Sequence, residues 1–155
     1  MRVLGIDPGT AITGYGLVDS SKGGIQFVAG GVIRTAGKQL LAPRLLEIFN
    51  GTTQLIAEYQ PDQMAIEILY FAKNVTTGMA VSHARGVVLL AAAQAGLPVA
   101  EYTPSQVKQA LTGYGKADKK QMQAMAQRLL KLSDLPKPDD AADALAVAIC
   151  HTAVS

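Results

Sequence analysis

The sequence predicts a mixed α/β sheet of five strands, three antiparallel and then parallel, flanked by helices on both faces. Two observations predict it. The first third of the chain holds three apolar stretches joined by tight turns, which is typical of an antiparallel meander. The remainder repeats apolar residues at helical spacing around two short apolar runs. The resulting order, β-β-β-α-β-α-β-α-α-α, indicates one α/β domain over residues 1–155.

The meander opens the chain. Its first strand, Val3–Ile6, ends in the turn composition Asp7-Pro8-Gly9-Thr10. The second strand spans Ile12–Asp19, a hairpin loop follows over Ser20–Gly24, and the third strand spans Ile25–Thr35. The pair Gly30-Gly31 predicts a β-bulge in that third strand.

The apolar pattern then takes a helical period. Pro43 suits the first turn of the first helix. We expect helices over Leu40–Tyr59, Thr76–Ala95, Pro104–Leu111, Lys119–Leu132 and Asp139–Thr152, and buried strands over Met64–Leu69 and Pro98–Thr103. A loop at Gly113–Gly115 and a linker over Ser133–Pro138 separate the last three helices.

Composition excludes several classes of protein. Hydrophobic residues make up 49% and charged residues 17%, which excludes intrinsic disorder. The longest apolar runs, Val87–Ala93 and Ala144–Cys150, have seven residues each, so no membrane association is expected. One cysteine allows no internal disulfide, and with His83 and His151 it does not make a Cys/His zinc site. These features predict a reduced, cytoplasmic location.

Charge is uneven along the chain. Lys73–Lys137 holds nine basic and three acidic residues, a net +6, whereas the remainder holds five basic and nine acidic, a net −4. A basic segment beside an acidic one suits a protein that holds a polyanion against a metal-loaded carboxylate cluster. The solvated surface of mixed helices explains the same charge equally well.

Two acidic residues lie in or directly after predicted strands. Asp7 follows the first strand, where a turn-forming Asp before Pro-Gly is common, but where sites in open α/β sheets also gather. Glu67 lies within the apolar run Met64–Leu69, and a strand covered on both faces has no favourable place for a carboxylate. An edge strand with Glu67 facing outward is the structural alternative.

Two more acidic residues lie on the last helix. Asp140 and Asp143 are three residues apart, so they share one face. Capping and the helix dipole explain Asp139 and Asp140 at the N-terminus but leave Asp143, one turn inside an apolar helix, unexplained. Four carboxylates brought together repel one another unless cations neutralise them, and hard oxygen ligands favour Mg²⁺ or Mn²⁺. Two such ions promote in-line attack at a phosphodiester.

Five short stretches, in order along essentially the whole chain, resemble the RuvC family of Holliday-junction resolvases in the RNase H-like superfamily. They are Gly5–Gly9, Ala65–Glu67 with Phe71–Asn74, Ala84–Gly86, Gln106–Gln109 and Asp140–Ala144. The resemblance implies an RNase H-like sheet in which Asp7, Glu67, Asp140 and Asp143 are the catalytic, metal-binding acids. Two Mg²⁺ ions per active site are expected, with Mn²⁺ able to substitute.

The resemblance also implies a function in DNA recombination and repair. We expect a homodimer that nicks two opposing strands of a four-way junction symmetrically, leaving 5′-phosphate and 3′-hydroxyl ends. Branch-migration proteins of the RuvA and RuvB type are expected to deliver the junction. Ile68, where the family often has Gln, and Tyr70, where Phe is common, bear on the sequence preferred at the cut.

Candidate DNA contacts surround the acidic residues. Tyr70 and Phe71 are adjacent aromatic residues just after Glu67, and we expect Tyr70 to stack on an unstacked base, with Lys73 meeting a phosphate beside Asn74. The resemblance assigns roles at DNA or the transition state to Lys108 and Lys119, and proximity to the Gly113–Gly115 loop adds Lys116 and Lys120. A solvated helix start and a core aromatic anchor remain the structural alternatives for these residues.

Other functions fit less of the sequence. Ile6–Thr10 also resembles the first phosphate loop of actin-like ATPases and sugar kinases, but 155 residues hold only one of their two lobes. A non-catalytic junction-binding module needs the basic segment but not four acidic residues. Another RNase H-like nuclease, acting on RNA or simple duplex, remains an alternative. The helix over Thr76–Ala95 is apolar on most of its circumference, which favours burial or a dimer interface.

Overall fold

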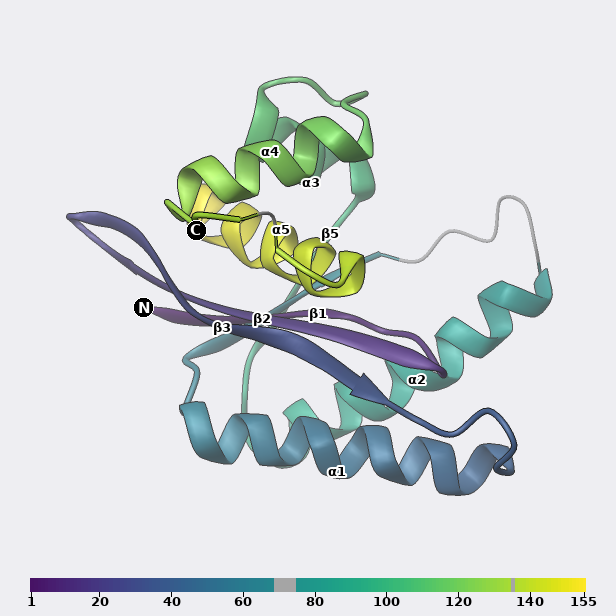
Figure 1. Cartoon of the computed structure of the whole chain (residues 1–155). Helices are drawn as coiled ribbons and strands as arrows, with labels where there is room; N and C mark the ends of the chain where they lie inside the picture. Colours follow the sequence, from purple (N-terminus) through teal and green to yellow (C-terminus); the bar gives the residue numbers. More distant parts are fainter. Residues whose placement is uncertain (69–74, 135) are drawn as a thin grey trace.

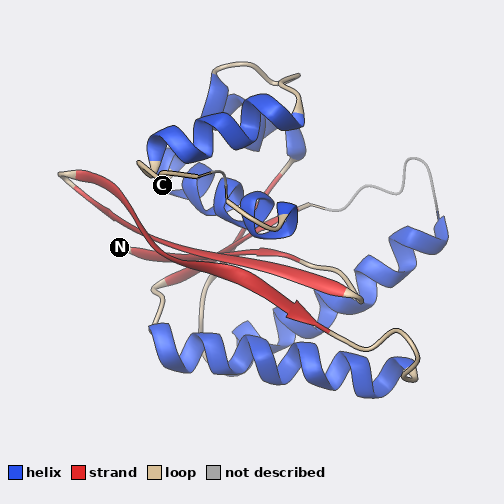
Figure 2. Cartoon of the chain, viewed as in Figure 1, coloured by secondary structure: helices blue, strands red, loops and turns tan. Residues whose placement is uncertain are grey.

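A five-stranded mixed sheet with the strand order β3-β2-β1-β4-β5 organises the computed structural model, which describes residues 1–68, 75–134 and 136–155. The strands are β1 (Arg2–Asp7), β2 (Ile12–Ser21), β3 (Gly24–Arg34), β4 (Gln63–Glu67) and β5 (Val99–Tyr102). The helices are α1 (Leu41–Tyr59), α2 (Val75–Gln94), α3 (Pro104–Thr112), α4 (Lys119–Leu129) and α5 (Asp139–Val154). Figure 2 shows the sheet between two groups of helices.

The pairing of the strands confirms the expected sheet. β1 and β2 are antiparallel, as are β2 and β3, whereas β4 pairs parallel with β1 and with β5. β4 is therefore an interior strand, and the edge-strand alternative for Glu67 is wrong. Most boundaries agree with the predicted ones within two residues; α4 ends earlier, at Leu129 rather than Leu132, and Lys131 follows with a left-handed φ of 54°.

Two predictions about the β2–β3 hairpin are wrong. Pairing continues to Ser21 and Gly24, so the turn is shorter than the predicted loop. The register shift lies between Leu17 and Val18, whose partners are Ala29 and Phe27, and not at Gly30-Gly31. Gly31 has a packing role instead: a β-carbon there would lie 2.7 Å from the hydroxyl oxygen of Tyr15, so the Tyr15 ring would have to shift to make room for a larger residue.

Helices cover both faces of the sheet (Figure 1), and each face has its own hydrophobic core. Strand residues alternate between the two faces, as the pleat requires. Val3, Val18 and Ala65 pack beneath α3, α4 and α5, and Leu4, Ile6, Leu17, Met64 and Ile66 pack against α1 and α2. Within the described residues, no helix is long and apolar enough to cross a membrane.

Glycines let α5 approach the sheet closely. Gly5 and Gly16 are paired across β1 and β2, and Gly14 is paired with Asp7. A β-carbon on Gly5 would overlap the backbone carbonyl of Ala144, and one on Gly14 would overlap that of Asp140. Because these glycines have no β-carbon, the backbone of α5 can pack directly on β1 and β2.

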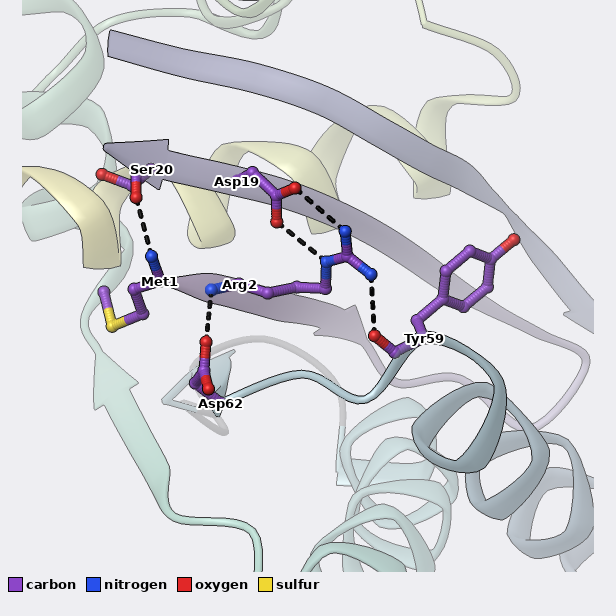
Figure 3. A network of polar contacts seen from close by, with 6 residues as sticks. All are labelled: Met1, Arg2, Asp19, Ser20, Tyr59 and Asp62. Atoms are coloured by element: carbon purple, nitrogen blue, oxygen red, sulfur yellow. Dashed lines mark hydrogen bonds and ion pairs between the residues drawn. The ribbon is translucent and has the colours of Figure 1, made fainter. Parts of the chain in front are cut away.

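A polar network at the other end of β1 ties the N-terminus to two elements (Figure 3). Arg2 Nε and Nη2 donate to the two carboxylate oxygens of Asp19 at 2.8 and 2.9 Å, and Nη1 donates to the carbonyl oxygen of Tyr59 at 2.8 Å. The backbone N–H of Arg2 donates to Asp62, and the terminal amine donates to the Ser20 carbonyl. The hydrogen bond from Arg2 holds the pKa of Asp19 below its ordinary value.

We expect Asp19→Asn to lower the free energy of unfolding at pH 7 by about 0.5–1 kcal/mol, a small effect because the pair is partly exposed to solvent. A lowered pKa in the folded state means that Asp19 stabilises the protein above its unfolded pKa, and that this stabilisation is lost as pH falls through the folded pKa. Urea unfolding of wild type and Asp19→Asn at pH 7 and pH 3 measures the loss of stability and its dependence on pH. A difference between the two proteins that is as large at pH 3 would contradict the pairing.

Candidate active site

Strand pleat and register bring Asp7 and Glu67 together. Asp7 follows Val3 and Gly5 on the face of β1 that α5 covers, and Glu67 follows Ala65 on the same face of β4. Ile6 pairs with Ile66 in the parallel β1–β4 ladder, so the next residue of each strand is an acid. The two carboxylates therefore stand side by side at the carboxyl ends of neighbouring strands.

The N-terminal part of α5 supplies the other two acids. Gly14 on β2 lies under the backbone of Asp140 and is itself paired with Asp7. Asp143 follows one turn later, above the same strand ends. The first turn of α5 has no side-chain cap, and Asp139 instead accepts a hydrogen bond from Gln123 Nε2 at 3.0 Å. The capping explanation for Asp139 and Asp140 is therefore wrong, whereas both residues do lie in the first turn of α5, where the helix dipole favours negative charge.

A cleft of about 340 Å³ opens between these strand ends and α3, α4 and α5. Three of the four predicted acids line it: Asp7, Glu67 and Asp143. Lys108 and Lys119 line it as well. Asp140 lines a neighbouring cleft with Gly9, Thr10 and the N-terminal parts of α1 and α2.

The acids raise one another's pKa values. Burial, followed by repulsion from Asp143, Asp140 and Glu67, raises the pKa of Asp7 to about 7. Burial and Asp143 raise the pKa of Glu67. Burial also raises the pKa of Asp143, although Lys119 opposes that shift. The cleft is thus a place where negative charge is unfavourable until a cation arrives.

The donor set fits a hard divalent cation. Four carboxylates line the cleft, those of Asp7, Glu67, Asp118 and Asp143, with no Cys or His among its lining residues. The Lys119 ammonium already lies 3.5 Å from Asp139 and 3.6 Å from Asp143, where it partly neutralises α5. In the described part of the chain, no three Asp, Glu, His or Cys side chains stand close enough to enclose an ion as they are oriented.

Comparison with known proteins decides the family. The family model of crossover junction endodeoxyribonuclease RuvC matches residues 3–151. The chain belongs to the RuvC family. It is 55% identical over 151 residues to the crossover junction endodeoxyribonuclease RuvC of Desulforamulus reducens, covering 97% of this chain and 93% of that protein.

Solved RuvC structures have the same fold. The Thermus thermophilus RuvC structure superposes with a TM-score of 0.92 at 36% identity, covering 99% of this chain and 94% of that one. T. thermophilus RuvC in complex with a Holliday junction substrate gives the same TM-score and identity over 97% of this chain and 92% of that one. The RNase H-like sheet expected from the RuvC resemblance is thereby confirmed.

The predicted DNA contacts of this RuvC chain fall into three groups. Lys108 and Lys119 lie in the cleft. Lys116 and Lys120 are exposed and lie outside its lining. Tyr70, Phe71, Lys73 and Asn74 lie outside the described residues.

Three other residues have local structural roles, and one of them, Gln106, belongs to a stretch that carries the RuvC resemblance. Gln106 completes a capping box with Thr103 at the start of α3, and its side chain accepts from the Thr103 N–H at 2.8 Å. Cys150 is buried, and burial raises its pKa to about 11, as expected of a core thiol. His151 is buried too, with its Nδ1 2.5 Å from the Tyr102 hydroxyl.

Sequence reasoning missed the glycines and one arginine. Gly14 and Gly16, two residues apart, lie on the same face of β2, and Gly16 is paired with Gly5 on β1. This spacing of glycines was the available signal for a helix packed closely on the sheet. Arg85 belongs to a motif that carries the RuvC resemblance, but its partner, the carbonyl of Glu67, comes from a segment 18 residues away. Only the folded chain brings those two groups together.

Proposed function

We propose that this protein resolves Holliday junctions by metal-dependent hydrolysis of two opposing DNA strands, in recombination and repair. The observation that carries the proposal is the convergence of Asp7, Glu67 and Asp143 in one cleft of a RuvC-family chain. Support for the substrate comes from the T. thermophilus relative, whose structure contains a Holliday junction. Residues 1–155 act as one nuclease domain in this proposal.

Asp7, Glu67, Asp140 and Asp143 would hold two Mg²⁺ ions, with Mn²⁺ as a substitute. When bound, such ions supply an activated water and neutralise charge on the leaving 3′ oxygen, which leaves 5′-phosphate and 3′-hydroxyl ends. The high pKa of Asp7 means that its proton must leave before a cation binds, so cation affinity rises with pH up to about 7. Lys108 and Lys119 present ammonium groups beside the acids, where a DNA phosphate would enter.

The proposed catalytic unit is a homodimer, because a junction with two-fold symmetry needs two equivalent active sites. Met79 and Leu90 of α2 are 54% and 58% exposed, and the N-terminal part of α1 adds Leu41 and Leu46. We place the dimer interface on this apolar surface. RuvA- and RuvB-type proteins are the proposed partners that deliver the junction. The cytoplasm is the proposed compartment, because the single cysteine is buried and unpaired.

The dimer predicts a mass twice the 16.2 kDa of one chain at micromolar concentration. Size-exclusion chromatography with light scattering measures it directly. Leu90→Glu should shift the protein towards monomer, because a charge on an apolar interface is not solvated there. A wild-type protein that is monomeric at all concentrations used for cleavage would contradict the proposed interface.

The function is tested with a labelled synthetic four-way junction, a linear duplex of the same sequence, Mg²⁺ or a chelator, and the Asp143→Asn variant. We expect paired nicks in opposite strands, on the junction alone, only with metal, and not with Asp143→Asn. Tight junction binding without cuts in Mg²⁺ or Mn²⁺ would instead indicate a binding module. Equal cleavage of the duplex, or of RNA, would indicate another RNase H-like nuclease.

Lys119→Ala is expected to weaken junction binding and to reduce the slope of log K against log salt by about one unit, the contribution of one phosphate contact. Lys119 is 57% exposed in its side chain and lies at the mouth of the acidic cleft. Binding is measured with chelator present, at several salt concentrations. Lys22→Ala, in the distant β2–β3 turn, is the matched control. An unchanged slope would exclude Lys119 as a phosphate contact.

A further inference from the structure

Arg85 on α2 contacts the end of β4, the strand that carries Glu67. The Arg85 side chain is only 15% exposed. Its helix, α2, lies on the face of the sheet opposite α5 (Figure 1). Nη1 donates to the backbone carbonyl oxygen of Glu67 at 2.6 Å. Nη2 forms an ion pair with the carboxylate of Glu101 on β5. One guanidinium therefore connects α2, β4 and β5.

Within the described residues, the end of β4 has few other backbone hydrogen bonds. Pairing with β1 stops at Ile6 and Ile66, one residue before Glu67. On the other side, the last contact with β5 is the hydrogen bond from the Ile68 N–H to the Tyr102 carbonyl, at 2.7 Å. Among the described residues, Arg85 is thus the partner that the structure gives to the Glu67 carbonyl oxygen. Rotation of the peptide that follows Glu67 would turn the Glu67 side chain relative to the cleft.

We propose that Arg85 is a positioning residue for cleavage: its guanidinium holds the Glu67 peptide so that the Glu67 carboxylate faces Asp7 and Asp143. The inference rests on the proposed metal-binding role of Glu67. A planar guanidinium donates to two acceptors in fixed directions, whereas a lysine ammonium does not reproduce that fork. A misplacement of about 1 Å at an active site costs about 10²-fold in rate, so a lost peptide restraint should be measurable.

Direct contact between Arg85 and DNA is the competing explanation. Both ends of the guanidinium are already engaged by protein oxygens, and the side chain is largely buried. A positioning residue and a phosphate contact differ in what they change: the first alters the rate at saturating protein and the metal requirement, and the second alters junction affinity and its salt dependence.

The experiment compares the full-length proteins carrying Arg85→Gln, Arg85→Lys and Glu101→Gln with wild type. Arg2→Gln is the matched control, because Arg2 also joins a carboxylate to a backbone carbonyl but at the far end of β1. Three quantities are measured: junction affinity with chelator, the single-turnover cleavage rate at saturating protein, and the Mg²⁺ concentration that gives half of the metal-induced rise in Tm. The last one does not depend on cleavage.

For Arg85→Gln we expect junction affinity within about twofold of wild type, cleavage slowed about 10- to 100-fold, and the Mg²⁺ midpoint raised about 3- to 10-fold. Arg85→Lys should fall between that variant and wild type. Glu101→Gln should have a smaller effect, because Arg85 keeps its hydrogen bond to the Glu67 carbonyl oxygen. Arg2→Gln should lower Tm and leave the cleavage rate and the Mg²⁺ midpoint unchanged.

Wild-type cleavage rates and Mg²⁺ midpoints in Arg85→Gln would overturn the inference, as would a loss confined to junction affinity. If Arg85→Gln does not fold, the cleavage rate and Mg²⁺ midpoint of Arg85→Lys test the inference by the same criteria. Glu101→Gln then serves as the milder variant for comparison. A wild-type protein that binds the junction and never cuts it contradicts the proposed function itself. Even if the wild-type protein does not cut the junction, a raised Mg²⁺ midpoint in the Arg85 variants would still support the positioning of Glu67.

Discussion

Asp7→Asn is expected to slow junction cleavage by about 10²- to 10³-fold or more, the usual effect of removing one group that stabilises transition-state charge. The same change should stabilise the metal-free protein at neutral and higher pH. Asp7 is half-buried among other acids, and its pKa is raised to about 7. A raised carboxyl pKa means that the folded state holds the proton more tightly than the unfolded state, so stability falls as pH rises from about 4 to about 7.

We therefore expect the variant to exceed wild type by about 2 kcal/mol in free energy of unfolding at pH 8, and by roughly a third of that at pH 5, where Asp7 keeps its proton in the folded state but has largely lost it in the unfolded state. Urea unfolding with chelator at the two pH values measures this difference. Mg²⁺ should stabilise wild type more than the variant. Asp134→Asn, an exposed acid, is the control. A variant that is less stable than wild type at pH 8 without metal would contradict the crowding of the acids.

Gly14→Ala is expected to destabilise the protein by about 3 kcal/mol, the upper part of the range for overpacking, and to impair cleavage with it. The added β-carbon would overlap the backbone carbonyl of Asp140, and a backbone group cannot rotate away as a side chain can. Either the sheet or α5 must move, and α5 carries two of the proposed metal-binding acids. Gly37→Ala is the control, because a β-carbon there meets nothing within 4 Å.

Chemical unfolding gives the stability of both glycine variants, and single-turnover cleavage of the junction gives their activity. Gly37→Ala should match wild type in both. If Gly14→Ala is within about 0.5 kcal/mol of wild type, the ordinary spread of surface substitutions, then α5 does not pack on β2 as closely as described. A stable Gly14→Ala protein with slow cleavage would separate the placement of α5 from its contribution to folding.

Local patterns in the sequence were sufficient for the elements of the fold. The period of apolar residues changes from two to a helical repeat after the third strand, and nearly all observed boundaries follow it within two residues. The bulge was misplaced because glycine pairs mark both bulges and close packing, and Gly31 serves the second purpose beneath the ring of Tyr15. Local composition does not distinguish these two uses of glycine.

The sequence by itself also singled out four acids as candidates: Asp7 follows an apolar strand, Glu67 interrupts another, and Asp140 and Asp143 share one face of an apolar helix. The sequence did not show that Asp140 lines a different cleft from the one that Asp7, Glu67 and Asp143 line together. Nor did it reveal that Lys119 pairs with Asp143, or that Arg85 holds the Glu67 carbonyl. Those contacts join segments far apart in the chain, and their geometry depends on how closely α5 and α2 pack on the sheet, which no local pattern encodes.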